Sequence, residues 1–244
     1  NEICPPKANP FDLIASLQEQ YNVFNSKEMA SIEEGNYAFT KPLTNYPRAE
    51  RVMTTCLFEK THTHLMQGGL YDLPRVGGKP YFCWLLFGHW GVESIQRKHA
   101  QEMVDRLALT GAKEIVCFHD DCYAMLATLA PGYGIEVPFR PVHLAQYLVT
   151  RLRQNRHHIK PLNISVAYQR PCASRHTPEK EHFVDELFDL AGVRRVPRAY
   201  DRENALCCAN IKLLLGNGDP RPDQEKNILD AKQGGAQAIV CLCP

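Results

Sequence analysis

The chain has 244 residues, of which 44% are hydrophobic and 23% charged, and its net charge is +1. This composition is typical of a globular protein with one large or two small domains, and the balanced charge excludes an electrostatic argument for binding nucleic acid or an anionic membrane surface. The longest apolar run, "YFCWLLFGHW" at residues 81–90, is about half the ~20 residues that a membrane-spanning helix needs.

The cysteine count is high, with ten in the chain. Ten cysteines are compatible with disulfides in a secreted protein, but a chain of this size does not need so many covalent links. Their spacing favours metal ligation in a reducing compartment. We therefore expect a cytoplasmic protein, associated with a membrane only through partner subunits.

Both ends of the sequence carry partial cysteine motifs. The opening "NEICPPKANPFDLI" contains Cys4 before a proline, as at the end of a ferredoxin-type run of cluster ligands. The closing "AIVCLCP" also stops inside what looks like a cysteine motif. We expect a portion of a longer polypeptide, with residues 1–48 as the tail of a ferredoxin-like region and Cys4 as a ligand of a shared [4Fe–4S] cluster.

Strands and helices are expected to alternate from residue 51 onward. Apolar runs bounded by turn residues predict strands or extended segments at 51–56, 114–119, 134–142, 163–169, 193–200 and 238–243. Apolar residues at helical spacing predict helices at 94–109, 121–130, 143–155, 178–192 and 222–233. This alternation predicts an α/β fold with mainly parallel sheets.

The sequence contains an internal repeat. With a shift of 124 residues, "TGAKEIVCFH" (110–119) aligns with "GGAQAIVCLC" (234–243), and Cys83 aligns with Cys207. Upstream, Cys56 and Cys172 each close a predicted strand, 27 and 35 residues before Cys83 and Cys207. Because loops tolerate such insertions, we predict two duplicated Rossmann-like half-domains, at residues 49–160 and 161–244.

The second copy places its cysteines after strands or before helices. These cysteines are Cys172, Cys207, Cys208 and Cys243. The carboxyl ends of parallel strands meet at one crevice, where ligands bind. Thiolates gathered there repel one another unless a metal or cluster neutralises them, and soft sulfur ligands select iron–sulfur clusters or zinc. Cys117 and Cys241 lie inside strands, and we expect both to be buried core residues.

This order of cysteines resembles the cysteine-rich "CCG" domain of heterodisulfide reductase catalytic subunits, a family in which two such domains occur in tandem. The resemblance covers nearly the whole chain from about residue 50. There are two departures. Ala209 stands in place of the glycine that follows the cysteine pair, and the last cysteine, expected at position 246, lies beyond Pro244.

The resemblance implies a redox site in the second copy. Cys172, Cys207, Cys208 and Cys243 would hold a noncubane iron–sulfur cluster or a [4Fe–4S] cubane, with Cys207 and Cys208 at the catalytic centre. In heterodisulfide reductase such clusters cleave a disulfide substrate with two electrons delivered singly. The resemblance also implies other redox subunits as partners, which can include a membrane subunit.

Three basic side chains flank Cys172 in "YQRPCASRH", namely Arg170, Arg175 and His176. They are candidates for binding an anionic substrate. A solvated basic turn explains them equally well.

The first copy has a different ligand set. It keeps Cys56 and Cys83, while Trp84 stands where the second cysteine of the pair is expected. His119 and Cys122, in "HDDC", follow the next strand. Three thiolates and one imidazole suit tetrahedral zinc or a [4Fe–4S] cluster with one nitrogen ligand. We expect this site to be structural or an electron relay.

Several polar residues near this set have two interpretations. Asp120 and Asp121 can orient His119 or cap the helix that follows, and the sequence favours a cap. His89 can line the first site, or a quinone or substrate pocket. The remaining pairs, His62 with His64 and His157 with His158, are expected to lie in a polar loop and at a solvated helix end.

The favoured function is that of an iron–sulfur oxidoreductase subunit of the heterodisulfide reductase type, acting on a disulfide or thiol substrate. One alternative is a non-catalytic electron relay in a larger membrane-associated respiratory complex. The other is a zinc-stabilised scaffold without redox chemistry.

Overall fold

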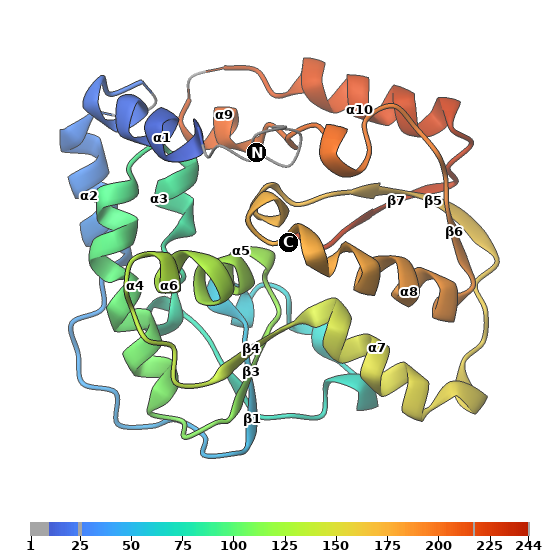
Figure 1. The fold of residues 1–244 in the computed structure, drawn as a ribbon, viewed down its shortest axis with the longest axis horizontal. Helices are drawn as coiled ribbons and strands as arrows, with labels where there is room; N and C mark the ends of the chain where they lie inside the picture. The colour runs from blue at the N-terminus through green and yellow to red at the C-terminus, as the bar shows by residue number, and fades with distance from the viewer. Residues whose placement is uncertain (1–9, 24–25, 217, 244) are drawn as a thin grey trace. The chain divides into compact units, whose positions relative to one another are not determined.

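The computed structural model describes residues 10–23, 26–216 and 218–243 (Figure 1). Cys4, a predicted cluster ligand, lies outside these residues. The described chain forms two compact units, one ending at Val142 and the other starting at His143. This division falls before the expected boundary at 160/161 because helix α7 (Leu144–Gln154) packs against α8 (Glu181–Ala191) of the second unit.

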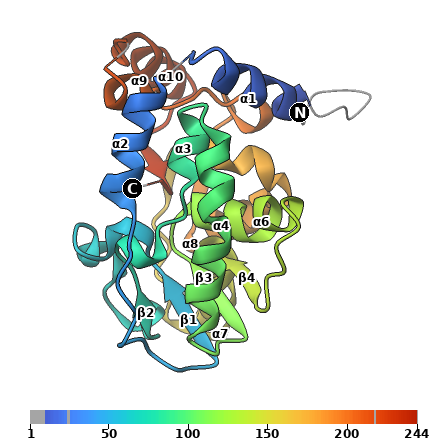
Figure 2. The same cartoon turned by 90° about the vertical axis from the view of Figure 1, so that its left-hand side faces the viewer.

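The first unit is built on a four-stranded sheet with the order β2-β1-β3-β4. Its strands are β1 (Arg51–Thr54), β2 (Arg75–Val76), β3 (Glu114–Cys117) and β4 (Arg140–His143). Strand β1 pairs in parallel with both β2 and β3. Its helices are α1 (Pro10–Gln20), α2 (Lys27–Tyr37), α3 (Leu85–His89), α4 (Glu93–Ala108), α5 (Asp120–Ala124) and α6 (Ala130–Gly132). Figure 2 shows α4 beside the sheet.

The helix expected at 121–130 is irregular. Helices α5 and α6 are joined by a π-helical segment, Met125–Leu129, and Pro131 lies inside α6 instead of ending the helix before it. Residues 120–132 form one continuous helical run, and the π-helical turn directly before Pro131 already departs from the i→i−4 hydrogen bonding that proline disrupts.

The second unit has a three-stranded sheet with the order β6-β5-β7. Strand β5 (Ile164–Gln169) pairs in parallel with β6 (Val193–Arg195) and with β7 (Ala238–Cys241). Two further helices are α9 (Asn210–Leu214) and α10 (Arg221–Gln233). In Figure 1 this sheet lies between α8 and α10.

Side chains on β5 alternate between two cores, as a strand requires. Val166 and Tyr168 pack against Val184 and Phe188 of α8. Ala167, on the opposite face, packs against Ala231 of α10. Helix α8 ends at Gly192, which has φ +66 and adopts the left-handed conformation common after helices.

The predicted α/β architecture with parallel sheets is confirmed. Helices α1, α2, α3 and α9 and the short strand β2 were not predicted from the sequence. None of the helices in the described part of the chain is long and apolar enough to cross a membrane.

One expectation about the core is wrong. Cys117 is fully buried, as expected, but Cys241 is exposed. The reason is the position of each strand: β3 lies between β1 and β4, whereas β7 is at the edge of its sheet.

Candidate metal centres

The first candidate centre consists of Cys56, Cys83, His119 and Cys122, and it lies where strands of the first unit end. Cys56 follows β1 and begins a short 3₁₀ helix, Cys56–Glu59. His119 follows β3 and precedes α5, which carries Cys122. Because β1 and β3 are parallel neighbours, their carboxyl ends meet at one edge of the sheet. Cys83 comes from the loop before α3.

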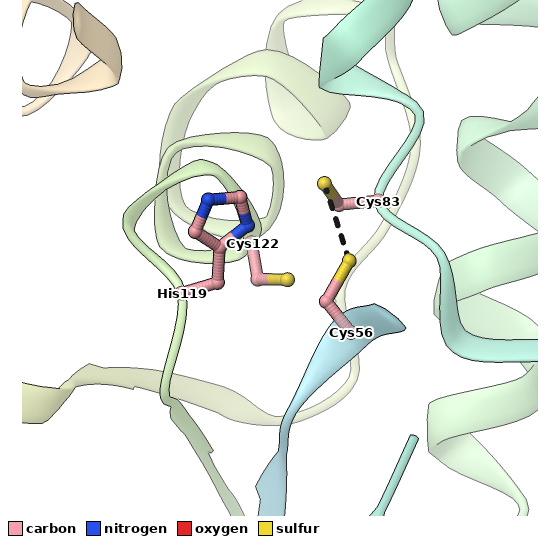
Figure 3. A group of neighbouring side chains, drawn as sticks. All are labelled: Cys56, Cys83, His119 and Cys122. Carbon is pink, nitrogen blue, oxygen red and sulfur yellow. Dashed lines mark hydrogen bonds between the residues drawn. The ribbon is translucent and has the colours of Figure 1, made fainter. Parts of the chain in front are cut away.

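The four side chains of the first centre are buried and converge (Figure 3). Their possible ligand atoms all lie within 4.8 Å of one another, and the Sγ atoms of Cys56 and Cys83 are 3.7 Å apart. Two thiolates bound at about 2.3 Å to one tetrahedral ion lie about 3.8 Å apart. The donor set therefore fits a single tetrahedral metal ion.

Electrostatics also favour a cation at the first centre. Burial opposes ionisation of Cys56, but hydrogen bonds from Cys122 and Cys83, together with His119, hold the pKa of Cys56 well below its ordinary value. Burial raises the pKa of Cys83 to about 12, and that of Cys122 lies well above its ordinary value for the same reason. Only one thiol ionises readily, since further thiolates in this apolar space need a positive charge to balance them.

Asp121 interacts with the imidazoles next to this centre. Its Oδ2 lies 3.8 Å from Nε2 of His119 and 3.3 Å from Nε2 of His89. Burial opposes its ionisation, but His119 and His89 hold the pKa of Asp121 below its ordinary value. The capping interpretation is wrong for this carboxylate: His119 is the N-cap residue of α5, makes no side-chain cap bond, and Asp121 is already helical. Metal-binding histidines commonly have such a carboxylate partner.

The loop that carries Cys83 is fixed by aromatic packing. Trp84 is buried and its ring stacks on His99, with ring centroids 3.8 Å apart. Trp84 has φ +61 and precedes α3, while Ala209 has φ +59 and precedes α9. By backbone conformation Trp84 therefore matches Ala209, Cys83 matches Cys208, and Phe82 occupies the place of Cys207. This match differs by one residue from the 124-residue shift, which pairs Trp84 with Cys208, so the correspondence between the two copies stays a prediction.

The second candidate centre consists of Cys172, Cys207, Cys208 and Cys243. Cys172 follows β5 and begins a 3₁₀ helix, Cys172–His176. Its Sγ lies 3.5 Å from Sγ of Cys207, and hydrogen bonds from Cys172 and Cys207 lower the pKa of Cys208 to about 3. The hydrogen bonds to Cys207 and Cys208 raise the pKa of Cys172 well above its ordinary value. The structure thus brings three of the predicted sulfur ligands together.

The second centre is more open than the first. Cys207, Cys208 and Cys243 are exposed, and Cys172 is half-buried. Within the described residues, the first centre alone has three or more cysteine, histidine or acidic ligand atoms within 4.8 Å of one another. All nine cysteines in this part of the chain are free thiols.

The basic residues next to Cys172 have different surroundings. Arg170 is buried, and its guanidinium forms an ion pair with Glu181 at 3.1 Å and donates to the carbonyl of Arg202 at 3.0 Å. Arg175 is exposed and donates to the carbonyl of Ala205 at 2.8 Å. His176 is half-buried in the same 3₁₀ helix. Both arginines thus hold the loop that leads to Cys207.

The other histidines lie as the sequence indicates. His62 and His64 stack on each other in a 3₁₀ turn at the surface, with ring centroids 6.1 Å apart. His157 and His158 are exposed after α7. His89 reaches the first centre through Asp121.

The chain is similar in sequence to one subunit of the dihydromethanophenazine:CoB–CoM heterodisulfide reductase of Methanosarcina mazei, with 27% identity over 168 residues. The aligned region covers 64% of this chain and 40% of that relative, so the chain spans less than half the relative's length. No protein-family model matches the chain. The relative supports the resemblance to heterodisulfide reductase subunits, while membership of the CCG domain family stays a prediction.

Two solved structures are similar at a low level. One is described as an Asp/Glu racemase from Yersinia pestis (TM-score 0.36, 16% identity, covering 80% of this chain and 86% of that chain). The other is an aspartate racemase homologue from Pyrococcus horikoshii (TM-score 0.34, 13% identity, covering 80% of this chain and 85% of that chain). A likeness of this size carries no argument about function.

Sequence reasoning missed the side chains that support the second centre. Gln169 donates to the carbonyl of Leu206 at 3.0 Å, and Gln224 donates to that of Cys208 at 3.1 Å. A glutamine that ends a strand or lies on a helix carries no sequence signal for such a role. The one sequence feature that pointed to a role for Gln169 at the second centre was its position three residues before Cys172.

Proposed function

We propose that this chain is an iron–sulfur oxidoreductase subunit that transfers electrons to or from a disulfide or thiol substrate at the second centre. The observation that carries the proposal is the convergence of Cys172, Cys207 and Cys208 in one hydrogen-bonded group. The distant similarity to a heterodisulfide reductase subunit supports it. Other redox subunits are the expected partners, because the relative is itself a subunit.

In this proposal the four cysteines of the second centre hold an iron–sulfur cluster. The bound cluster supplies one-electron transfer. The chain contributes a preformed sulfur group in which the pKa of Cys208 is lowered to about 3, and an exposed cation, Arg175, three residues after Cys172. Arg175 and His176 are then better placed than Arg170 to receive an anionic substrate, because Arg170 is buried and paired with Glu181.

We assign a structural zinc ion to the first centre. Its four ligands are buried, and the 3.7 Å separation of two sulfur atoms matches one tetrahedral ion. An iron–sulfur cube placed between these ligands would hold them farther apart. A closed set of four protein ligands is typical of structural zinc sites.

We further infer that the two units are duplicated half-domains. In each sheet the first strand, β1 or β5, lies between the next two strands of its unit. Each of these strands is followed by a cysteine that opens a 3₁₀ helix, Cys56 or Cys172. Each unit also has a cysteine directly before a left-handed residue, Trp84 or Ala209.

The test is a metal and sulfide analysis of the full chain purified without oxygen. We expect Cys207→Ser to lose iron and acid-labile sulfide but keep zinc, and Cys83→Ser to lose zinc but keep iron. Cys241→Ser is the matched control, because Cys241 is exposed and lies two residues from Cys243 without belonging to either centre. It should change neither metal.

The outcome separates the candidate functions. Iron and sulfide together with disulfide-dependent oxidation of the reduced protein support the proposal. Iron and sulfide without any response to a disulfide or thiol indicate an electron relay. A protein that takes up zinc only, even after anaerobic incubation with iron and sulfide, would be a scaffold and would contradict the proposal.

A further inference from the structure

The loop that presents Cys207 and Cys208 is held by side-chain donors at four of its backbone carbonyls. The donor and carbonyl pairs are Arg170 with Arg202, Arg175 with Ala205, Gln169 with Leu206, and Gln224 with Cys208. Gln169 ends β5 and Arg170 directly follows it, while Arg175 lies in the 3₁₀ helix Cys172–His176 and Gln224 lies in α10. Carbonyls of an irregular surface loop usually bond to water, so this loop has unusually specific support.

The bond to Leu206 is the end of a directional chain of hydrogen bonds. The chain starts at Arg198, whose side chain is only 1% exposed and is anchored to the carbonyl of Tyr168 at 2.6 Å. A guanidinium can only donate, and its Nη1 lies 2.6 Å from Oδ1 of Asn227. Asn227 must therefore turn its oxygen to Arg198 and its Nδ2 to Oε1 of Gln169.

The same logic fixes Gln169. Because its Oε1 accepts from Asn227, its Nε2 is left to donate to Leu206 at 3.0 Å. The oxygen and nitrogen of a side-chain amide are normally hard to distinguish, and the hydrogen-bond network must decide between them. Here the buried guanidinium of Arg198 fixes the orientation of both side-chain amides. As a result, Nε2 of Gln169 donates to the carbonyl of Leu206, the residue directly before Cys207.

We propose that Gln169 is a positioning residue of the second centre, oriented by Asn227 and Arg198, and that it holds the Cys207–Cys208 loop in its metal-binding shape before the metal arrives. The inference rests on the proposed function, because it gives this loop the task of binding a cluster. Removing hydrogen bonds that orient the ligands of a metal typically lowers the metal affinity of the site.

The test uses an isosteric substitution, Gln169→Glu, which replaces the donor with an oxygen and leaves the packing unchanged. The matched control is Gln237→Glu. Gln237 lies just before β7, and its Oε1 accepts from the N–H of Ser165 at 2.8 Å, so a glutamate there keeps the acceptor. Asn227→Asp breaks the same chain one step earlier and serves as the second variant if Gln169→Glu does not fold.

Two readouts are measured on the full chain. Hydrogen exchange of peptides spanning 202–210 is followed in metal-free protein, and we expect Gln169→Glu to speed it about tenfold, as expected for the loss of one hydrogen bond. Iron content and the EPR spectrum are measured after anaerobic incubation with iron and sulfide. We expect lower iron content and a changed EPR signal in Gln169→Glu, and wild-type values in Gln237→Glu.

The outcomes distinguish this inference from the proposed function. Equal exchange at 202–210 in the two folded glutamate variants overturns the chain of hydrogen bonds. Faster exchange with wild-type iron content and EPR signal overturns the positioning role. A wild-type protein that takes up no iron overturns the proposed function and with it that role, while the exchange result still decides whether the chain of hydrogen bonds exists.

Discussion

At the scale of single residues, Trp84 and Ala209 share an uncommon backbone conformation directly after a candidate ligand. Their φ angles are +61 and +59. A β-carbon in this left-handed region costs roughly 1–2 kcal/mol, which is why glycine usually occupies such positions. In the CCG domain that this sequence resembles, glycine occupies the position of Ala209. The left-handed backbone conformation at this position favours glycine, which accounts for that preference.

We predict that Ala209→Gly raises the free energy of unfolding by about 0.5–1 kcal/mol, because relief of the backbone strain exceeds the loss of one buried methyl group. Ala205→Gly is the matched control. Ala205 is equally buried in the same loop but has φ −56, so glycine there should lower the free energy of unfolding by about 1 kcal/mol. Urea unfolding without oxygen measures both, and equal changes would contradict the argument.

Asp121 gives a second prediction at this scale. Asp121→Asn removes the charge that faces His119 and His89, and we expect zinc affinity to fall about 10- to 100-fold. Competition with a coloured chelator measures the affinity. Asp105→Asn, at the surface of α4, should leave it unchanged. An unchanged affinity in Asp121→Asn would mean that the carboxylate does not support the ligand.

At the scale of elements, side-chain ion pairs connect neighbouring strands of the first sheet, in addition to the hydrogen bonds between their backbones. Glu114 of β3 bonds to Arg51 of β1 at 2.6 Å and also pairs with Arg140 of β4. Burial opposes ionisation of Glu114, but Arg140 and Arg51 hold its pKa below the ordinary value. Its contribution to stability is therefore present above its unfolded pKa of about 4.3 and is lost as pH falls through the lower folded value.

We predict that Glu114→Gln lowers the free energy of unfolding by about 1 kcal/mol at pH 7, and that the difference from wild type shrinks toward zero below about pH 4. Urea unfolding at several pH values measures it. Glu50→Gln is the control: Glu50 pairs with Lys113, and both side chains are more than 70% exposed, so little change is expected at any pH. A difference that grows on acidification would contradict this sign.

The elements with a clear apolar period could be predicted from the sequence, and those that depend on tertiary contacts could not. Helix α8 was expected from its apolar spacing, and Val184 and Phe188 form its buried stripe. Helix α2 has few apolar residues to bury. It is tied to α4 by Glu34, which bonds to His99 at 2.6 Å and to Lys98 at 2.7 Å, and no local pattern reveals such contacts.

At the scale of the whole molecule, the two units have related sheets but unlike sites. Residues that follow parallel strands converge, so the sequence could indicate both candidate sets, and the structure brings together the four residues of the first and three cysteines of the second. The sequence could not predict that one set is enclosed and the other open, since this depends on what covers each strand. Cys241 is the clearest case: its sequence context matches that of Cys117, but its strand is at an edge.

This contrast predicts selective alkylation of the metal-free, reduced protein. Iodoacetamide should modify Cys207 and Cys208 first, because both are exposed and the pKa of Cys208 is lowered to about 3. Cys83 and Cys122 should react at least tenfold more slowly, because burial keeps them protonated and inaccessible. Mass spectrometry of timed samples measures each peptide. Equal rates at all sites would show that the first centre is not closed without metal.

The aromatic packing beside Cys83 has a practical consequence. The chain has two tryptophans, Trp84 and Trp90, and both are buried in the first unit, one of them next to a candidate zinc ligand. Intrinsic tryptophan fluorescence is therefore a reporter of the first unit alone, while visible absorption of an iron–sulfur cluster would report on the second. With the proposed cluster bound, the wild-type protein would carry two separate optical signals, and the unfolding of each unit could be followed in one sample without any added label.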